Sequence, residues 1–213
     1  MSEEPKNVTR LIFGKQHITI LSDERNPRVI ERPKRSSPCN CSVISMPAKG
    51  RRSVAYKLYQ RAMILDENPT TVDEAERLYK EVIQLDPWLD LAYTNLGKIK
   101  YDYYHDLQSA REWFQKAISI NPKQAEALYN LGHVLNSQGD NKQAILLLLD
   151  AIALDPSFAD AHYNLAVAYD QIGDYRQARP YWESFIELSR KNQSVDRYVE
   201  HAKMTLSRTA YRF

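Results

Sequence analysis

The fold of this protein is decided by residues 125–158, which read AEALYNLGHVLNSQGDNKQAILLLLDAIALDPSF. Leucines at every third or fourth position of the first half fall on one stripe of a helix, and Gly139 and Asp140 then break that pattern. A second apolar helix follows and ends before Pro156, because proline disfavours helix for the residue that precedes it. The stretch therefore predicts two antiparallel helices joined by a tight turn.

The same pattern returns every 34 or 35 residues. Four kinds of marker residue keep this step, and they are Asn95, Asn130 and Asn164, each before a leucine; Pro87, Pro122 and Pro156; Ala75, Ala110, Ala144 and Ala178; and the bulky Tyr79, Phe114, Leu148 and Trp182. A period of this length is typical of stacked helix pairs, which bury their apolar faces against their neighbours. The sequence therefore predicts an all-α solenoid.

The order of a small residue, Leu-Gly, Gly-Asp, alanine, an aromatic residue and Asp-Pro resembles the tetratricopeptide repeat (TPR). The resemblance covers about residues 53–190 and implies a right-handed α-α superhelix of four units. The units span about residues 53–89, 90–124, 125–158 and 159–190. The first is the most degenerate, as expected of a terminal repeat. A further amphipathic helix at 194–208, with Ser194 as its N-cap, is expected to close the stack as a C-terminal capping helix.

The first fifty residues form a separate basic extension. Two β-prone runs between residues 9 and 21, on either side of Gly14-Lys15-Gln16, predict a β-hairpin. A lone hairpin is marginal in water, so we expect it to dock on the exposed face of the first unit. Residues 22–50 are rich in Pro, Arg and Ser and predict an extended or disordered linker.

The charge is divided unevenly between this arm and the rest. Residues 1–52 hold eleven Lys/Arg against five Asp/Glu, whereas the remainder holds 18 against 22. One hypothesis is that the basic segment Arg25–Arg35 lies in the groove of its own chain, or of a second copy, and competes with the ligand; a solvated linker is the alternative. A nucleic-acid partner is not expected, because the arm lacks aromatic residues interleaved with its cations.

Composition argues against several other classes of protein. No apolar run approaches the roughly 20 residues that span a bilayer. The polar N-terminus and the presence of only two cysteines, Cys39 and Cys41, favour a cytoplasmic protein without disulfides or a structural zinc site. The chain has no glycine-rich phosphate loop, no His-Glu-x-x-His and no Gly-x-Ser-x-Gly, so we expect no catalysis, cofactor, metal or small-molecule substrate.

In the family that the chain resembles, the first helices of successive units line a concave groove that takes an extended peptide or a partner helix. Carried over by position, the resemblance assigns thirteen candidate peptide-binding residues. They are Thr94, Asn95, Lys98 and Tyr101 in the second unit; Glu126, Tyr129, Asn130, His133 and Asn136 in the third; and Tyr163, Asn164, Val167 and Asp170 in the fourth. The three asparagines align as a ladder, and an amide offers a peptide backbone both a donor and an acceptor. Alternatively, each asparagine bonds to a neighbouring helix of its own chain.

Carboxylates at Asp102, Glu126, Asp160 and Asp170 would make this groove prefer neutral or basic segments. The sequence thus favours a non-catalytic protein–protein interaction scaffold or adaptor. The alternative is a structural subunit packed by its convex face or its N-terminal arm within a larger complex, or a regulator of a catalytic partner. Homo-oligomers are compatible with either function.

Overall fold

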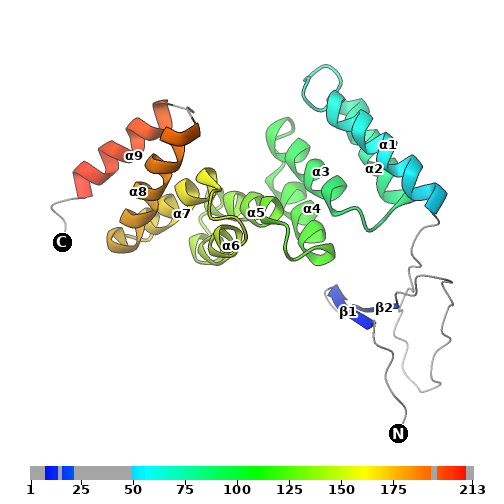
Figure 1. Ribbon diagram of the computed structural model, residues 1–213, viewed down its shortest axis with the longest axis horizontal. Helices are drawn as coiled ribbons and strands as arrows, with labels where there is room; N and C mark the ends of the chain where they lie inside the picture. The colour runs from blue at the N-terminus through cyan, green and yellow to red at the C-terminus, as the bar shows by residue number, and fades with distance from the viewer. Residues whose placement is uncertain (1–7, 14–15, 22–48, 193–195, 210–213) are drawn as a thin grey trace, which may run out of the picture.

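The structure is a computed structural model that describes residues 8–13, 16–21, 49–192 and 196–209. In this part of the chain, two strands precede nine helices. Their bounds are β1 Val8–Phe13, β2 Gln16–Leu21, α1 Lys49–Leu65, α2 Val72–Leu85, α3 Asp90–Asp102, α4 Leu107–Ile120, α5 Ala125–Ser137, α6 Asn141–Leu154, α7 Ala159–Gln171, α8 Tyr175–Asn192 and α9 Asp196–Thr209. Helices α1 to α8 form four antiparallel pairs that follow one another in a row (Figure 1). The all-α solenoid predicted from the repeats is confirmed.

The tight turns of the third and fourth pairs are set by glycine. Gly139 and Gly173 have φ angles of +82° and +80°, in the left-handed region that glycine adopts without a steric penalty. After α5, the backbone N–H of Asp140 donates to the carbonyl of Leu135 at 2.9 Å, which satisfies a helix-end carbonyl and turns the chain back. Each short turn therefore holds two helices antiparallel.

Close approach within the pairs depends on two glycines in the first helices. A Cβ atom on Gly132 would lie 2.8 Å from Cγ of Leu148, and one on Gly97 would lie 2.6 Å from Cδ1 of Phe114. Both partners are almost completely buried, so they have little room to move aside. The Leu-Gly marker of the sequence is thus a packing requirement.

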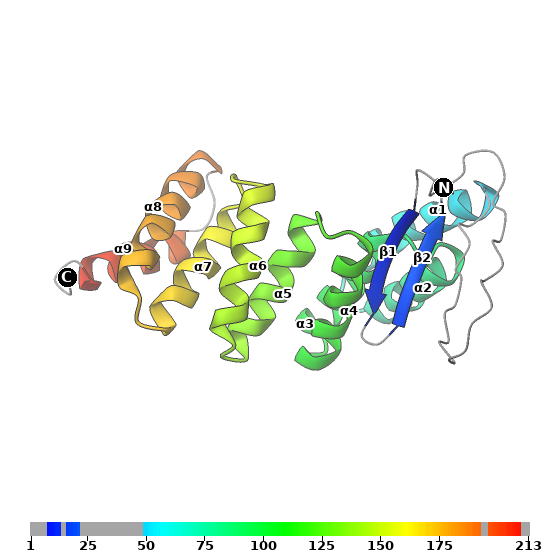
Figure 2. The same cartoon turned by 90° about the horizontal axis from the view of Figure 1, so that it is seen from below.

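The two ends of the row differ (Figure 2). At one end, α1 begins at Lys49, four residues before the expected start of the first unit. At the other end, α9 packs on α8 through Ala202, next to Trp182 and Phe185. A helix thus lies where the capping helix is expected, and its role as a cap stays a prediction.

The N-terminal strands form an antiparallel pair in which Val8 lies opposite Leu21 and Phe13 opposite Gln16. Docking of this pair on the first unit stays a prediction. Residues 22–48 of the predicted linker, with the basic segment Arg25–Arg35 and both cysteines, lie outside the described residues, as does Ser194. The last two linker residues, 49 and 50, belong instead to α1. Within the described helices, none is both long and apolar enough to cross a membrane.

Candidate peptide-binding face

The first helices of the pairs, α1, α3, α5 and α7, are linked to one another by side-chain bonds, and we call the surface they form the A-helix face. Lys98 on α3 pairs with Glu126 on α5 at 3.2 Å. His133 on α5 is bonded to Tyr101 on α3 and to Asn164 on α7. All thirteen candidate residues lie on α3, α5 or α7, so the fold brings them onto three adjacent helices.

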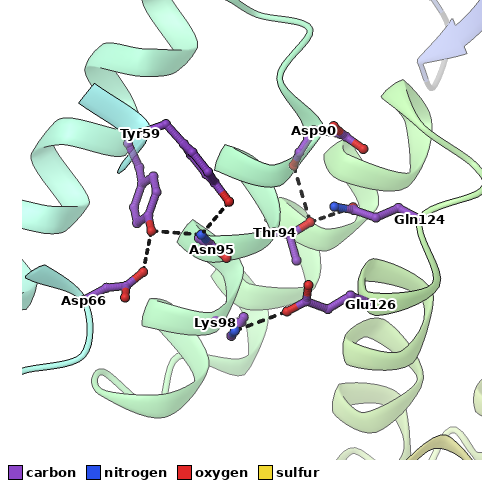
Figure 3. Close-up of polar contacts among 9 residues, drawn as sticks. Tyr59, Asp66, Asp90, Thr94, Asn95, Lys98, Gln124 and Glu126 are labelled. Carbon is purple, nitrogen blue, oxygen red and sulfur yellow. Dashed lines mark hydrogen bonds and ion pairs between the residues drawn. The ribbon is translucent and has the colours of Figure 1, made fainter. Parts of the chain in front are cut away.

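Asn95 bonds to the first helix pair (Figure 3). Its side-chain amide donates to the hydroxyl of Tyr79 at 2.9 Å and, over a longer distance, to the hydroxyl of Tyr59 at 3.4 Å. The Tyr79 hydroxyl in turn donates to Asp66. Burial, reinforced by Asp66, raises the pKa of Tyr79 well above its usual range, so this hydroxyl keeps its proton. Asn95 therefore joins α3 to α1 and α2.

Three of the candidate residues, Thr94, Asn136 and Asn164, are buried, and the first two bond across to the next helix pair. Thr94 is inaccessible to solvent, and its hydroxyl donates to Oε1 of Gln124 at 2.7 Å (Figure 3). Asn136 donates from Nδ2 to the backbone carbonyl of Asn164 at 2.9 Å. Both contacts cross from one helix pair to the next. In this structure, Thr94 and Asn136 hold neighbouring units together and present almost no surface.

A chain of polar contacts crosses the middle of the face. Nε2 of His133 lies 2.7 Å from the Tyr101 hydroxyl, and its Nδ1 lies 3.1 Å from Oδ1 of Asn164. An amide oxygen only accepts, so Nδ1 carries the imidazole proton and Nε2 accepts from tyrosine. Tyr129 stacks on the same ring with centroids 6.1 Å apart and also contacts Phe158. Four candidate side chains are thus fixed by one another.

Asn130 is the exception among the three asparagines. It makes no side-chain hydrogen bond in the described part of the chain, and its Nδ2 is buried. The reason can be read from the repeat, because Phe114 occupies the position at which the preceding unit has Tyr79 and so lacks a hydroxyl. At Asn164 the equivalent residue is Leu148, and His133 supplies the partner instead. One amide of the ladder is therefore left unpaired.

The C-terminal part of the face is covered by α9. The hydroxyl of Tyr163 lies 3.1 Å from Nδ1 of His201, and its ring packs edge-on against Tyr198 and Trp182. Burial raises the pKa of Asp170, although Trp182, His201 and Arg208 oppose that shift. The neighbouring Val167 is half-buried in the same cluster. These three candidate residues face α9 or the cluster beneath it.

The charges that remain outward are mostly acidic. Lys98 and Glu126 neutralise each other, whereas Asp102 and Asp160 are exposed without an ion pair to another described residue. Partial burial raises the pKa of Asp102, and Lys98, His133 and His105 act in the opposite direction. The middle of the A-helix face therefore carries a buried, unpaired amide at Asn130 and two exposed carboxylates that act on the adjacent Tyr129.

Sequence reasoning missed several residues that shape this face. Tyr79 was visible as a bulky marker, but nothing in the repeat showed that its hydroxyl meets Asn95. Tyr59 and His201 lie in the degenerate first unit and in α9, where no repeat position assigns them a contact. Among the described residues, no three His, Cys, Asp or Glu side chains come together as a metal-binding group.

Three family models match the chain. Two described as tetratricopeptide repeat match residues 91–124 and 159–192, and residues 113–145; a third, described as TPR repeat, matches residues 132–173. No curated protein matched the sequence. The matched residues cover the second to fourth helix pairs, and the first pair lies outside them.

Solved structures of similar shape support the fold. A crystal structure of MamA protein is 25% identical and covers 70% of this chain and 80% of its own, with a TM-score of 0.56. MamA residues 41 to the end from Desulfovibrio magneticus RS-1 is 23% identical, with coverages of 75% and 86% and a TM-score of 0.61. Pseudomonas aeruginosa pilF is 22% identical, with coverages of 76% and 73% and a TM-score of 0.63. With its repeat matches over residues 91–192 and its right-handed α-α superhelix, the chain belongs to the tetratricopeptide-repeat family.

Proposed function

We propose that this chain is a non-catalytic scaffold that binds an extended, neutral or basic segment of a partner protein across the A-helix face. Solenoids of this family typically act as interaction scaffolds, and their extended surfaces suit a linear ligand. The observation that carries the proposal is Asn130, whose amide has no partner within the described residues. An unpaired buried polar group costs free energy, and a ligand backbone that pairs with it after a small side-chain rotation removes that cost.

The charge around Asn130 sets the preferred ligand. Asp102 on α3 and Asp160 on α7 both act electrostatically on Tyr129, the residue next to Asn130, and Glu126, already paired with Lys98, lies one helical turn before Asn130. A lysine or arginine of the ligand would be attracted to the two unpaired carboxylates, Asp102 and Asp160, whereas an acidic segment would be repelled by them. The binding site then centres on α3 and α5, because α9 covers the face of α7 around Tyr163.

A test that needs no known partner is selection from a library of random linear peptides on the intact protein. We expect enriched peptides to carry a net positive charge and to bind with an affinity that falls as salt rises. Asn130→Ala should weaken them about fivefold, the worth of one hydrogen bond of roughly 1 kcal/mol. Asp102→Asn combined with Asp160→Asn should weaken basic peptides more than neutral ones.

Asn95→Ala is the matched control, since it removes an equivalent amide that is already bonded inside the protein. It should leave peptide affinity unchanged in protein that is shown to be folded. The proposal would be contradicted if the selected peptides bound the Asn130→Ala variant and the Asp102→Asn/Asp160→Asn variant with unchanged affinity.

One observation favours the second candidate, a subunit packed by the face of the second helices. Leu146 on α6 is 65% exposed, and Leu154 at the end of the same helix is also exposed. On α8, another of the second helices, Arg179 is exposed and bonds to Glu183, while Tyr181 stacks on Tyr169. Leu146→Asp with Arg179→Ala should abolish an assembly of this kind and leave peptide binding intact.

A further inference from the structure

Helix α1 differs in charge from every other described helix. Its 17 residues carry five lysines and arginines and no aspartate or glutamate, whereas each of the others contains at least one carboxylate. Arg52 and Arg61 are paired with acids of the first helix pair, at 3.8 and 2.7 Å. Arg51 and Lys57 are exposed and have no ion pair with another described residue. The helix therefore has cationic charge that the described fold does not neutralise.

The same helix exposes large apolar side chains. Val54, Tyr56, Met63 and Ile64 are 50%, 54%, 44% and 73% exposed, and Ile64 is the most exposed large apolar side chain among the described residues. The buried side of the helix consists of Ala55, Tyr59 and Ala62, which pack in the cluster with α2 and α3. Isolated exposed apolar residues are ordinary, but Val54 and Ile64 share one outward stripe of the helix and together point to a binding surface.

Helical spacing interleaves the two kinds of side chain. Val54, Lys57, Arg61 and Ile64 follow one another at steps of three and four residues, which places them on one outward stripe. Figure 1 shows α1 at the end of the row of helices, with no further helix on its outer side. We call this surface, made of Arg51, Val54, Lys57, Arg61 and Ile64, the α1 outer face.

We propose that the α1 outer face binds an anionic lipid surface, with α1 lying in the plane of the headgroups. Charge complementarity selects the occupant, because unneutralised cations attract anionic headgroups while the apolar side chains beside them enter the headgroup–acyl boundary. A peptide helix would need a groove with two walls, whereas no further helix lies on the outer side of α1. Nucleic acid phosphates would use the cations but gain nothing from exposed Val54 and Ile64. The proposed peptide site centres on α3 and α5, so this proposal does not depend on peptide binding.

The test is flotation of the full chain with vesicles of phosphatidylcholine alone or with 30% phosphatidylglycerol, at low and high salt. We expect partitioning onto the anionic vesicles only, and a decrease as salt rises, because screening weakens attraction between exposed charges. Arg51→Glu with Lys57→Glu should lower the partition coefficient at least tenfold, since each cation near an anionic leaflet contributes a factor of about five. Val54→Ser with Ile64→Ser should lower it severalfold at either salt concentration.

The matched control is Lys123→Glu with Lys142→Glu, which makes the same change in net charge at exposed positions away from α1. It should bind vesicles within about twofold of the unmodified protein. Each variant is first checked for unchanged helicity. The proposal is overturned if the protein stays off anionic vesicles, or if this control loses as much binding as the α1 charge variant. It is also overturned if the Val54/Ile64 variant binds normally, because cations alone would then act as they do on any polyanion.

Discussion

Alanine substitution should have opposite effects on stability at Asn95 and at Asn130. The two residues hold equivalent repeat positions on first helices, so helix propensity and side-chain volume change by the same amount in both variants. What differs is the hydrogen bonding, because Asn95 donates to Tyr79 at 2.9 Å whereas Nδ2 of Asn130 has no partner. The difference between the two variants therefore measures hydrogen-bond satisfaction of the amide at this repeat position.

The magnitude follows from that difference. Asn95→Ala removes a neutral hydrogen bond, which contributes about 1 kcal/mol to stability, and leaves the Tyr79 hydroxyl bonded only to Asp66. Asn130→Ala removes an unsatisfied buried group, whose presence costs about 1 kcal/mol or more. The free energies of unfolding of the two variants should therefore differ by about 2 kcal/mol, with Asn130→Ala the more stable.

Urea unfolding followed by circular dichroism at 222 nm measures this difference. With a slope of about 2 kcal/mol per molar urea, the two midpoints should lie about 1 M apart, on either side of the unmodified protein. The slopes should agree, since neither change alters the surface exposed on unfolding. Equal destabilisation in both variants would refute the reasoning, because Asn130 would then have a partner inside the fold.

Three further predictions concern packing, charge and the C-terminal helix. Gly97→Ala should lower the free energy of unfolding by about 1–2 kcal/mol in the same assay, because the added methyl group overlaps the buried Phe114 ring. The control Gly50→Ala has open space around the added methyl group and should not lower it. Equal urea midpoints for the two variants would contradict this packing argument. Burial would raise the pKa of Glu76, but its ion pairs with Lys100 and Lys80, both at 2.7 Å, lower it below its ordinary value of 4.5. A carboxyl group whose pKa is lowered by folding stabilises the fold at pH values above its unfolded-state pKa. Glu76→Gln should therefore lower the free energy of unfolding by about 1–3 kcal/mol at pH 7, and this loss should shrink as the pH falls below 4.5. A loss that does not depend on pH would exclude the ion pairs as its cause. Ending the chain at residue 192 should uncover Trp182 and Phe185, lower the melting temperature and promote self-association, which sedimentation velocity measures. An unchanged melting temperature and no self-association would show that α9 does not act as a cap.

The sequence by itself determined the helix pairs, because they depend on local rules that repeat. A leucine stripe, a glycine in the left-handed region at residues 139 and 173, and a proline after the second helices of the first three pairs specify where helices run and where the chain turns. The repeat also predicted the close packing of Gly97 and Gly132 against a bulky residue of the second helix, for the same reason.

Only the tertiary structure decided which side chains of the predicted groove are free. The three asparagines look alike in sequence, yet Asn95 and Asn164 find partners 16 and 31 residues away, on helices that meet them only after packing. Asn130 finds no partner among the described residues. A hydroxyl at Tyr79, its absence at Phe114 and an imidazole at His133 give each amide a different environment. Tyr163 likewise met His201 only when α9 folded back onto α7, a contact 38 residues apart that the repeat period does not encode. Local propensity sets the helices, whereas hydrogen-bond satisfaction between helices depends on distant residues and sets the surface that is left for a ligand.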